Sequence, residues 1–144
     1  MSVRVFVAND HEILRGALRA VIDMQPDMEV VGEAATGLDA ELRIKETEPD
    51  VVLMDISTHN CGGLDAIAAL KRIRSGTRIV VLTFQEELGY IRTAVWRRAD
   101  GYVVKRALNT ELLTAIRAVA RGAAESTYAQ GTARSTERAR ARQA

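Results

Sequence analysis

Four apolar runs in this chain each end on a polar residue whose side chain can take part in chemistry. The runs span residues 3–8, 51–54, 79–82 and 102–104, and they are followed by Asn9 with Asp10, Asp55, Thr83 and Lys105. Continuously apolar runs of this length are typical of strands that are buried on both faces. The carboxyl ends of parallel strands meet at one edge, where open α/β sheets bind ligands. Two carboxylates, a hydroxyl and an ammonium at such an edge would suit a divalent cation together with a phosphoryl group.

The segments between these runs have the spacing of amphipathic helices. Apolar side chains recur at helical spacing in two places, at Leu14, Leu18, Val21 and Ile22 and again at Leu112, Leu113, Ile116 and Val119. A looser stripe covers residues 64–73, and we expect a further strand over 29–34 and further helices over 38–47 and 87–97. Five alternating strand–helix units predict one doubly wound α/β domain with a parallel sheet and helices on both faces.

Composition narrows the class of protein. The length of 144 residues suits a single domain, and the net charge of +1 argues against a strongly basic surface for nucleic acid. No stretch is long and apolar enough to cross a membrane, and no signal peptide precedes Val3, so we expect a cytoplasmic protein without membrane contact. The lone Cys61 cannot form an internal disulfide, and no cluster of Cys and His has zinc spacing.

Several separated motifs occur together in a specific order. They read VANDH at 7–11, VVLMD at 51–55, VVLT at 80–83 and GYVVK at 101–105. Residues 1–122 thereby resemble the receiver domain of two-component response regulators. The NDH run, VGEA at 31–34 and ADGY at 99–102 are most similar to the NarL/FixJ subfamily, whose members usually carry a LuxR-type helix-turn-helix after the receiver. The resemblance implies a flavodoxin-like (βα)5 fold with strand order 2-1-3-4-5.

The resemblance also implies a phosphoacceptor and a metal site. Asp55 would accept a phosphoryl group from a sensor histidine kinase and form an aspartyl phosphate. Mg²⁺ would be shared by Asp10, Asp55 and the backbone carbonyl of Ser57, with Asn9 acting through a metal-bound water. The alternative for Asp10 is a purely local role as the N-cap of a helix that begins near Glu12.

Three further residues would complete the site by the same resemblance. Lys105 would pair with phosphoryl oxygens, the Thr83 hydroxyl would bond to one of them, and Tyr102 would follow Thr83 inward as part of a switch. Each has a simpler interpretation, as a surface lysine, a β-branched strand residue and a core tyrosine respectively. His11 is expected to cap or pack at the helix start.

Two departures from the family pattern bear on function. Asn9 stands where most receivers have a second acid, which predicts weaker metal binding and less repulsion in the metal-free pocket. In the loop after Asp55, Thr58 and His59 stand where the family usually has Met and Pro. His59 and Cys61 could bind a soft metal or sense redox state, but an ordinary exposed loop is the favoured interpretation.

Residues 123–144 differ in composition from the rest of the chain. They are rich in Ala, Arg, Ser and Thr and have no apolar periodicity, which indicates a linker or tail. The subfamily resemblance places a DNA-binding domain after such a linker, so we expect contact with DNA only through a domain absent from this chain. Phosphorylation could also promote a homodimer, whose interface the sequence does not identify.

Three functional hypotheses follow. The first is a phosphorylated receiver that controls transcription and is not itself an enzyme. The second is a pseudo-receiver, a protein-binding or dimerisation module that works without phosphorylation, with Asn9 and the altered loop as signs of decay. The third is a phosphohydrolase with an aspartyl phosphate intermediate. Such enzymes place a second acid where this chain has Ser57, so the third is disfavoured.

Overall fold

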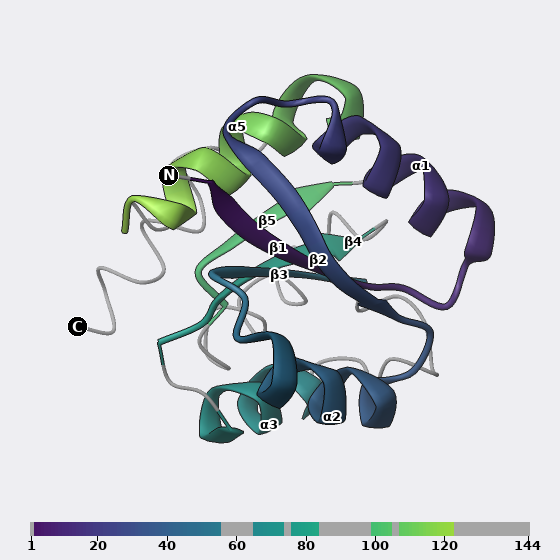
Figure 1. Ribbon diagram of the computed structural model, residues 1–144, viewed down its shortest axis with the longest axis vertical. Coiled ribbons are helices and arrows are strands. Elements are labelled where there is room, and N and C mark those ends of the chain that lie inside the picture. The colour runs from purple at the N-terminus through teal and green to yellow at the C-terminus, as the bar shows by residue number, and fades with distance from the viewer. Residues whose placement is uncertain (1, 56–64, 74–75, 84–98, 105–106, 123–144) are drawn as a thin grey trace.

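A five-stranded parallel sheet forms the centre of the protein, seen in the computed structural model (Figure 1). The structure describes residues 2–55, 65–73, 76–83, 99–104 and 107–122. The strands are β1 (Val3–Ala8), β2 (Met28–Ala34), β3 (Val51–Asp55), β4 (Arg78–Thr83) and β5 (Gly101–Val104). They lie in the order β2-β1-β3-β4-β5. This order confirms the predicted fold, and every strand predicted from the sequence is present.

Helices cover both faces of the sheet. Helices α1 (Glu12–Asp23) and α5 (Leu108–Ala120) lie on one face, and α2 (Gly37–Thr47) and α3 (Asp65–Ile73) lie on the other (Figure 1). The helix predicted over 87–97 lies outside the described residues.

The core divides into two clusters because successive strand residues point to opposite faces. In β1, Val5 and Val7 pack toward α1 and α5, whereas Phe6 and Ala8 pack toward α2 and α3. All of these side chains are fully buried. The inner strands are therefore covered on both faces, as the continuous apolar runs predicted, whereas the edge strand β2 is only partly buried.

Helix α1 departs from one expectation. Leu18 and Ile22 are buried, but Val21 is 42% exposed and does not belong to the core face. Leu18 and Ile22 are four residues apart and stack on one line of the helix, whereas Val21 lies about 100° away from Ile22 around the axis. The buried stripe of α1 is thus narrower than the sequence pattern indicated.

Ion pairs tie two of the helices to the amino-terminal ends of the strands. Lys71 of α3 donates to Asp100 Oδ2 at 2.8 Å and to the Thr77 carbonyl at 2.7 Å. Arg117 of α5 donates through Nε and Nη2 to the two carboxylate oxygens of Asp27, at 2.8 and 3.0 Å. The hydrogen bonds from Arg117 hold the pKa of Asp27 below its usual value. These pairs lie away from the carboxyl edge of the sheet, so they act on the scaffold.

The described helices include no segment with the length and apolar character needed to cross a membrane.

Candidate functional site

The carboxyl ends of β1 and β3 lie side by side where the sequence predicts a site. Ala8, the last residue of β1, pairs with Met54 of β3, so Asn9 and Asp55 are the next residues along two neighbouring strands. Both side chains are fully buried, and Asp10 is partly exposed. Backbone pairing continues past the end of β1, because Asn9 N donates to the Ala34 carbonyl at 3.0 Å. The fold therefore holds the predicted amide and the predicted phosphoacceptor on adjacent strands.

The other predicted residues are only partly within the described region. Thr83 is the last residue of β4 and lies at the same edge, where it pairs with Val104 of β5. Leu82, the residue before Thr83, pairs with Asp55 of β3. Ser57 and Lys105 lie outside the described residues, as do His59 and Cys61. The roles assigned to them from the sequence stay predictions.

Tyr102 occupies the core. Its side chain is 1% exposed and belongs to the cluster that packs between the sheet and helices α2 and α3. This position fits the packing interpretation of Tyr102. Its proposed role in a switch stays a prediction.

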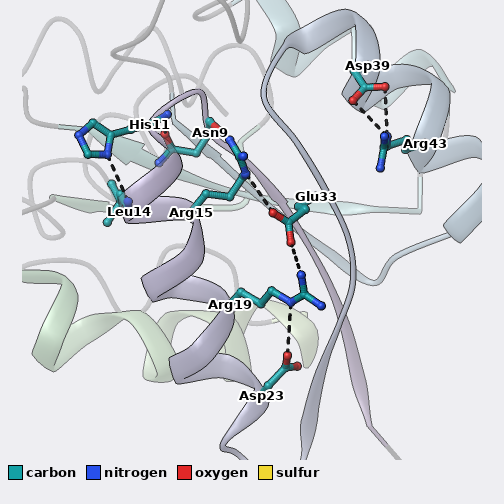
Figure 2. Close-up of polar contacts among 9 residues, drawn as sticks. All are labelled: Asn9, His11, Leu14, Arg15, Arg19, Asp23, Glu33, Asp39 and Arg43. Carbon is teal, nitrogen blue, oxygen red and sulfur yellow. Dashed lines mark hydrogen bonds and ion pairs between the residues drawn. The ribbon is translucent and has the colours of Figure 1, made fainter.

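The turn from β1 into α1 is organised by two side-chain acceptors (Figure 2). Asn9 Oδ1 accepts a hydrogen bond from the backbone N–H of His11 at 2.7 Å, which closes an Asx turn. His11 is the N-cap of α1, and its Nδ1 accepts from Leu14 N at 3.2 Å. The expectation for His11 is confirmed, and the alternative that Asp10 caps this helix is wrong, because its neighbour fills that position.

A chain of ion pairs connects this turn to helix α1 and strand β2 (Figure 2). Arg15 Nη1 donates to the Asn9 carbonyl at 2.8 Å, and Arg15 Nε donates to Glu33 Oε1 at 3.0 Å. Arg19 Nη1 donates to the other oxygen of Glu33 at 2.7 Å, and Arg19 also pairs with Asp23. Arg15 is the best buried of these arginines, with 17% of its side chain exposed against 60% for Arg19.

Arg15 and Glu33 were not among the residues predicted for the site. The signal that could have found them is the spacing of Arg15 and Arg19, one helical turn apart on the first helix, together with the acids Glu29 and Glu33 in the strand predicted next. The contact of Arg15 with the Asn9 carbonyl carries no sequence signal, because it depends on how the turn is folded.

The oxygen-rich edge suits a hard divalent cation with few protein ligands. Asp55 supplies a buried carboxylate and Asp10 a partly exposed one. Mg²⁺ keeps several of its waters and is usually bound by one or two carboxylates together with phosphate oxygens. Within the described part of the chain, His, Cys, Asp and Glu do not gather in groups of three or more that could hold a metal ion. The donors present therefore fit a site that is completed by water and by a phosphoryl group.

Comparison with known proteins points to the same family. Residues 5–117 match the response regulator receiver domain. The chain is 40% identical over 122 residues to the uncharacterized transcriptional regulatory protein YxjL of Bacillus subtilis, covering 85% of this chain and 56% of that protein. It is 38% identical over 120 residues to the transcriptional regulatory protein DesR of the same organism, covering 83% of this chain and 59% of DesR.

A solved structure extends the similarity to the fold. A LuxR-family two-component response regulator from Aurantimonas sp. SI85-9A1 superposes with a TM-score of 0.86 at 29% identity, covering 98% of this chain and 99% of that one. The chain spans a little over half of the length of the curated relatives named above. The family predicted from the strand-end motifs is confirmed, and the chain belongs to the receiver domains of two-component response regulators.

Proposed function

We propose that this receiver domain accepts a phosphoryl group on Asp55 from a sensor histidine kinase. The observation that carries the proposal is the position of Asp55, a fully buried carboxylate at the end of the central strand β3, beside Asn9 and Asp10 at the end of β1. Carboxylate oxygens are hard ligands, and one or two carboxylates together with phosphate oxygens are the usual ligands of Mg²⁺. An edge that collects such groups from adjacent strands is suited to bind a cation and a phosphoryl group together.

The transfer itself requires little covalent chemistry from the protein. A carboxylate oxygen of Asp55 attacks the phosphorus, the bond from phosphorus to the donor atom breaks, and the bonding electron pair leaves with the donor. With acetyl phosphate as donor, the leaving group is acetate, which needs no proton. Mg²⁺, when bound, supplies the positive charge that lets a carboxylate approach an anionic donor. Asp10, Asp55, the Ser57 carbonyl and Asn9 through a water are the ligands that we propose for it.

The response to phosphorylation involves residues farther along the edge. We propose that Lys105 pairs with phosphoryl oxygens, that the Thr83 hydroxyl bonds to one of them, and that Tyr102 repacks as Thr83 moves. Thr83 is the last residue of β4 and follows Leu82, which pairs with Asp55, and this position supports the proposed role of Thr83. The outcome is a shift between two packings of the surface near β5.

The output that we propose is control of transcription. The relatives YxjL and DesR are transcriptional regulatory proteins, and this chain spans a little over half of their length. Contact with DNA would be made by a helix-turn-helix domain outside this chain, and phosphorylation could promote a homodimer. Such a relay, from a kinase to DNA, would operate in the cytoplasm.

The test is intact mass after incubation with acetyl phosphate and Mg²⁺. We expect the wild type to gain one phosphoryl group and Asp55→Asn to gain none. Asp39→Asn is the matched control, because Asp39 lies on α2 and pairs with Arg43, apart from Asn9 (Figure 2). It should gain the same mass as the wild type. Labelling of Asp55→Asn would place the phosphoacceptor elsewhere.

The alternative is a pseudo-receiver that binds a partner without phosphorylation. The specific observation in its favour is Asn9, which removes one carboxylate from the pocket. The two functions separate with beryllofluoride and Mg²⁺. A wild type that takes up neither beryllofluoride nor phosphate, yet still dimerises or binds a partner, would establish the pseudo-receiver.

A further inference from the structure

The two halves of the Asn9 amide are used differently. Oδ1 accepts the hydrogen bond from His11 N at 2.7 Å, whereas the buried Nδ2 donates to no acceptor among the residues that the structure describes. The oxygen and nitrogen of an amide are distinguished by their hydrogen bonds. The backbone N–H of His11 needs an acceptor, so the amide oxygen must face the turn. The NH₂ group of Asn9 therefore points the other way. A buried donor without an acceptor is costly, and it marks a position where a ligand can supply one.

The backbone around this donor is held from two further sides. Asn9 N donates to the Ala34 carbonyl at 3.0 Å, and the Asn9 carbonyl accepts from Arg15 Nη1 at 2.8 Å. With the Oδ1 bond to His11, these contacts fix both the main chain and the side-chain plane. The Nδ2 group is therefore preorganised, and binding of an acceptor would need little rearrangement.

Asp55 is the place where such an acceptor would arrive. Asn9 and Asp55 follow the paired residues Ala8 and Met54, so they are neighbours on adjacent parallel strands, and both are fully buried. A phosphoryl group on Asp55 would bring three anionic oxygens into this space. Nitrogen-bound hydrogens do not coordinate Mg²⁺, which takes oxygen ligands. The same hydrogens make strong, charge-assisted bonds to phosphoryl oxygens.

We infer that Asn9 Nδ2 donates a hydrogen bond to an oxygen of the phosphoryl group carried by Asp55. This inference rests on the proposed function and extends it, because it makes Asn9 a ligand of the anion in addition to any contact with a metal-bound water. A carboxylate at this position would do the opposite, since it would attract the cation and repel the phosphoryl group. The amide therefore shifts the preference of the pocket from metal binding toward anion binding.

Two substitutions separate the donor from the turn. Asn9→Ser removes the N–H₂ group without adding charge, and its hydroxyl can still accept from His11 N, because Ser forms the same kind of turn as Asn. Asn9→Asp keeps the turn and the size of the side chain, but it replaces the donor by an acceptor and adds a negative charge. Calorimetric titration would measure two affinities in each protein, that for Mg²⁺ alone and that for beryllofluoride at saturating Mg²⁺.

The expected result is a split between the two affinities. Asn9→Ser should bind beryllofluoride about tenfold more weakly at saturating Mg²⁺, the effect expected for loss of one hydrogen bond to a charged group. Its loss of affinity for Mg²⁺ alone should be clearly smaller than that. Asn9→Asp should bind Mg²⁺ more tightly and beryllofluoride more weakly. In the wild type, the side-chain amide protons of Asn9 should shift downfield in the NMR spectrum when beryllofluoride is added.

Other outcomes would overturn the inference. Equal losses in both affinities for Asn9→Ser would mean that Asn9 acts through the metal, and no loss in either would mean that its donor is unused. If Asn9→Ser does not fold, the amide resonances of the wild type decide, and their failure to shift on beryllofluoride binding refutes the contact. A wild type that binds no beryllofluoride and is not labelled on Asp55 contradicts the proposed function itself, which is a different result.

Discussion

Gly32 is required by a close approach between two strands. It lies opposite Phe6, at the point where β2 carries one more residue than β1 because the register shifts between Val5 and Phe6. A Cβ atom at Gly32 would lie 2.8 and 3.0 Å from two ring carbons of Phe6. The backbone of Gly32 is not in the left-handed region, so alanine could adopt its conformation. Any cost of Gly32→Ala therefore comes from contact with the ring.

The size of this cost follows from how little the ring can move. Carbon atoms pack best at separations of about 3.5 to 4.0 Å, so the new methyl carbon would lie about 0.7 Å or more too close to the nearest ring carbon. Phe6 is fully buried in the core cluster and cannot turn outward. Overpacking of this kind costs about 1 to 3 kcal/mol. Full burial of the methyl returns about 0.8 kcal/mol, so we expect a net loss of about 0.2 to 2.2 kcal/mol in the free energy of unfolding.

Gly16 supplies a control of opposite sign. It lies inside α1 on an exposed position, and a Cβ there meets nothing within 4 Å. Because glycine is a poor helix former, Gly16→Ala should stabilise the protein by about 0.5 to 1 kcal/mol. Both variants can be compared with the wild type by urea unfolding followed by far-UV circular dichroism.

A pair of results would refute this reasoning about Gly32. One is a Gly32→Ala protein as stable as the wild type. The other is a loss that persists unchanged when Phe6 is replaced by Leu, since the cost should fall once the ring is gone.

The remaining predictions concern the ion pairs. Lys71→Met should lower the free energy of unfolding by about 2 to 3 kcal/mol, because it breaks a mostly buried ion pair with Asp100, which keeps its hydrogen bond from Ile79 N. A loss of less than about 0.5 kcal/mol in a urea titration would contradict this prediction. Arg117→Met should destabilise the protein above about pH 4 and progressively less as the pH falls. The reason is that Arg117 lowers the pKa of Asp27, so the stability that this pair contributes is lost when Asp27 is protonated. Thermal unfolding of both proteins at pH 7 and pH 3 measures the loss of stability, and an equal loss at the two pH values would refute the prediction. Arg15→Met should reduce the rate of phosphorylation by acetyl phosphate by loosening the Asn9 carbonyl, whereas Arg19→Met, which leaves that contact intact, should not.

The sheet was predictable from the sequence because most of its strands are buried on both faces. Burial on both faces produces continuous apolar runs, and these gave the strands to within a residue or two of their observed bounds. Val21 shows the limit of the same method for helices. A helical stripe has two edges, and the identity of an apolar residue at an edge does not reveal whether the neighbouring layer reaches it.

The place of Asn9 and Asp55 in the fold was predictable from the sequence, but the geometry around them was not. Asp55 and Asn9 follow apolar runs, so their place at the carboxyl edge follows from strand topology alone. The direction of the Asn9 amide does not, because it depends on which backbone N–H the turn presents. The Arg15 contact with Glu33 joins residues 18 apart in the chain, so the helical spacing of Arg15 and Arg19 indicates a charged face but does not identify its partner.

The ionic chain behind Asn9 and the amide itself have a common physical effect. An acid at position 9 would place a further carboxylate beside the buried Asp55 side chain. Repulsion between the two carboxylates would then destabilise the metal-free folded state. Asn9 removes that repulsion, so the backbone here can be set by neutral hydrogen bonds and by Arg15, whose charge is balanced by Glu33 and not by the pocket. The Arg15 guanidinium is thus paired with Glu33 and holds the turn between β1 and α1 through the Asn9 carbonyl.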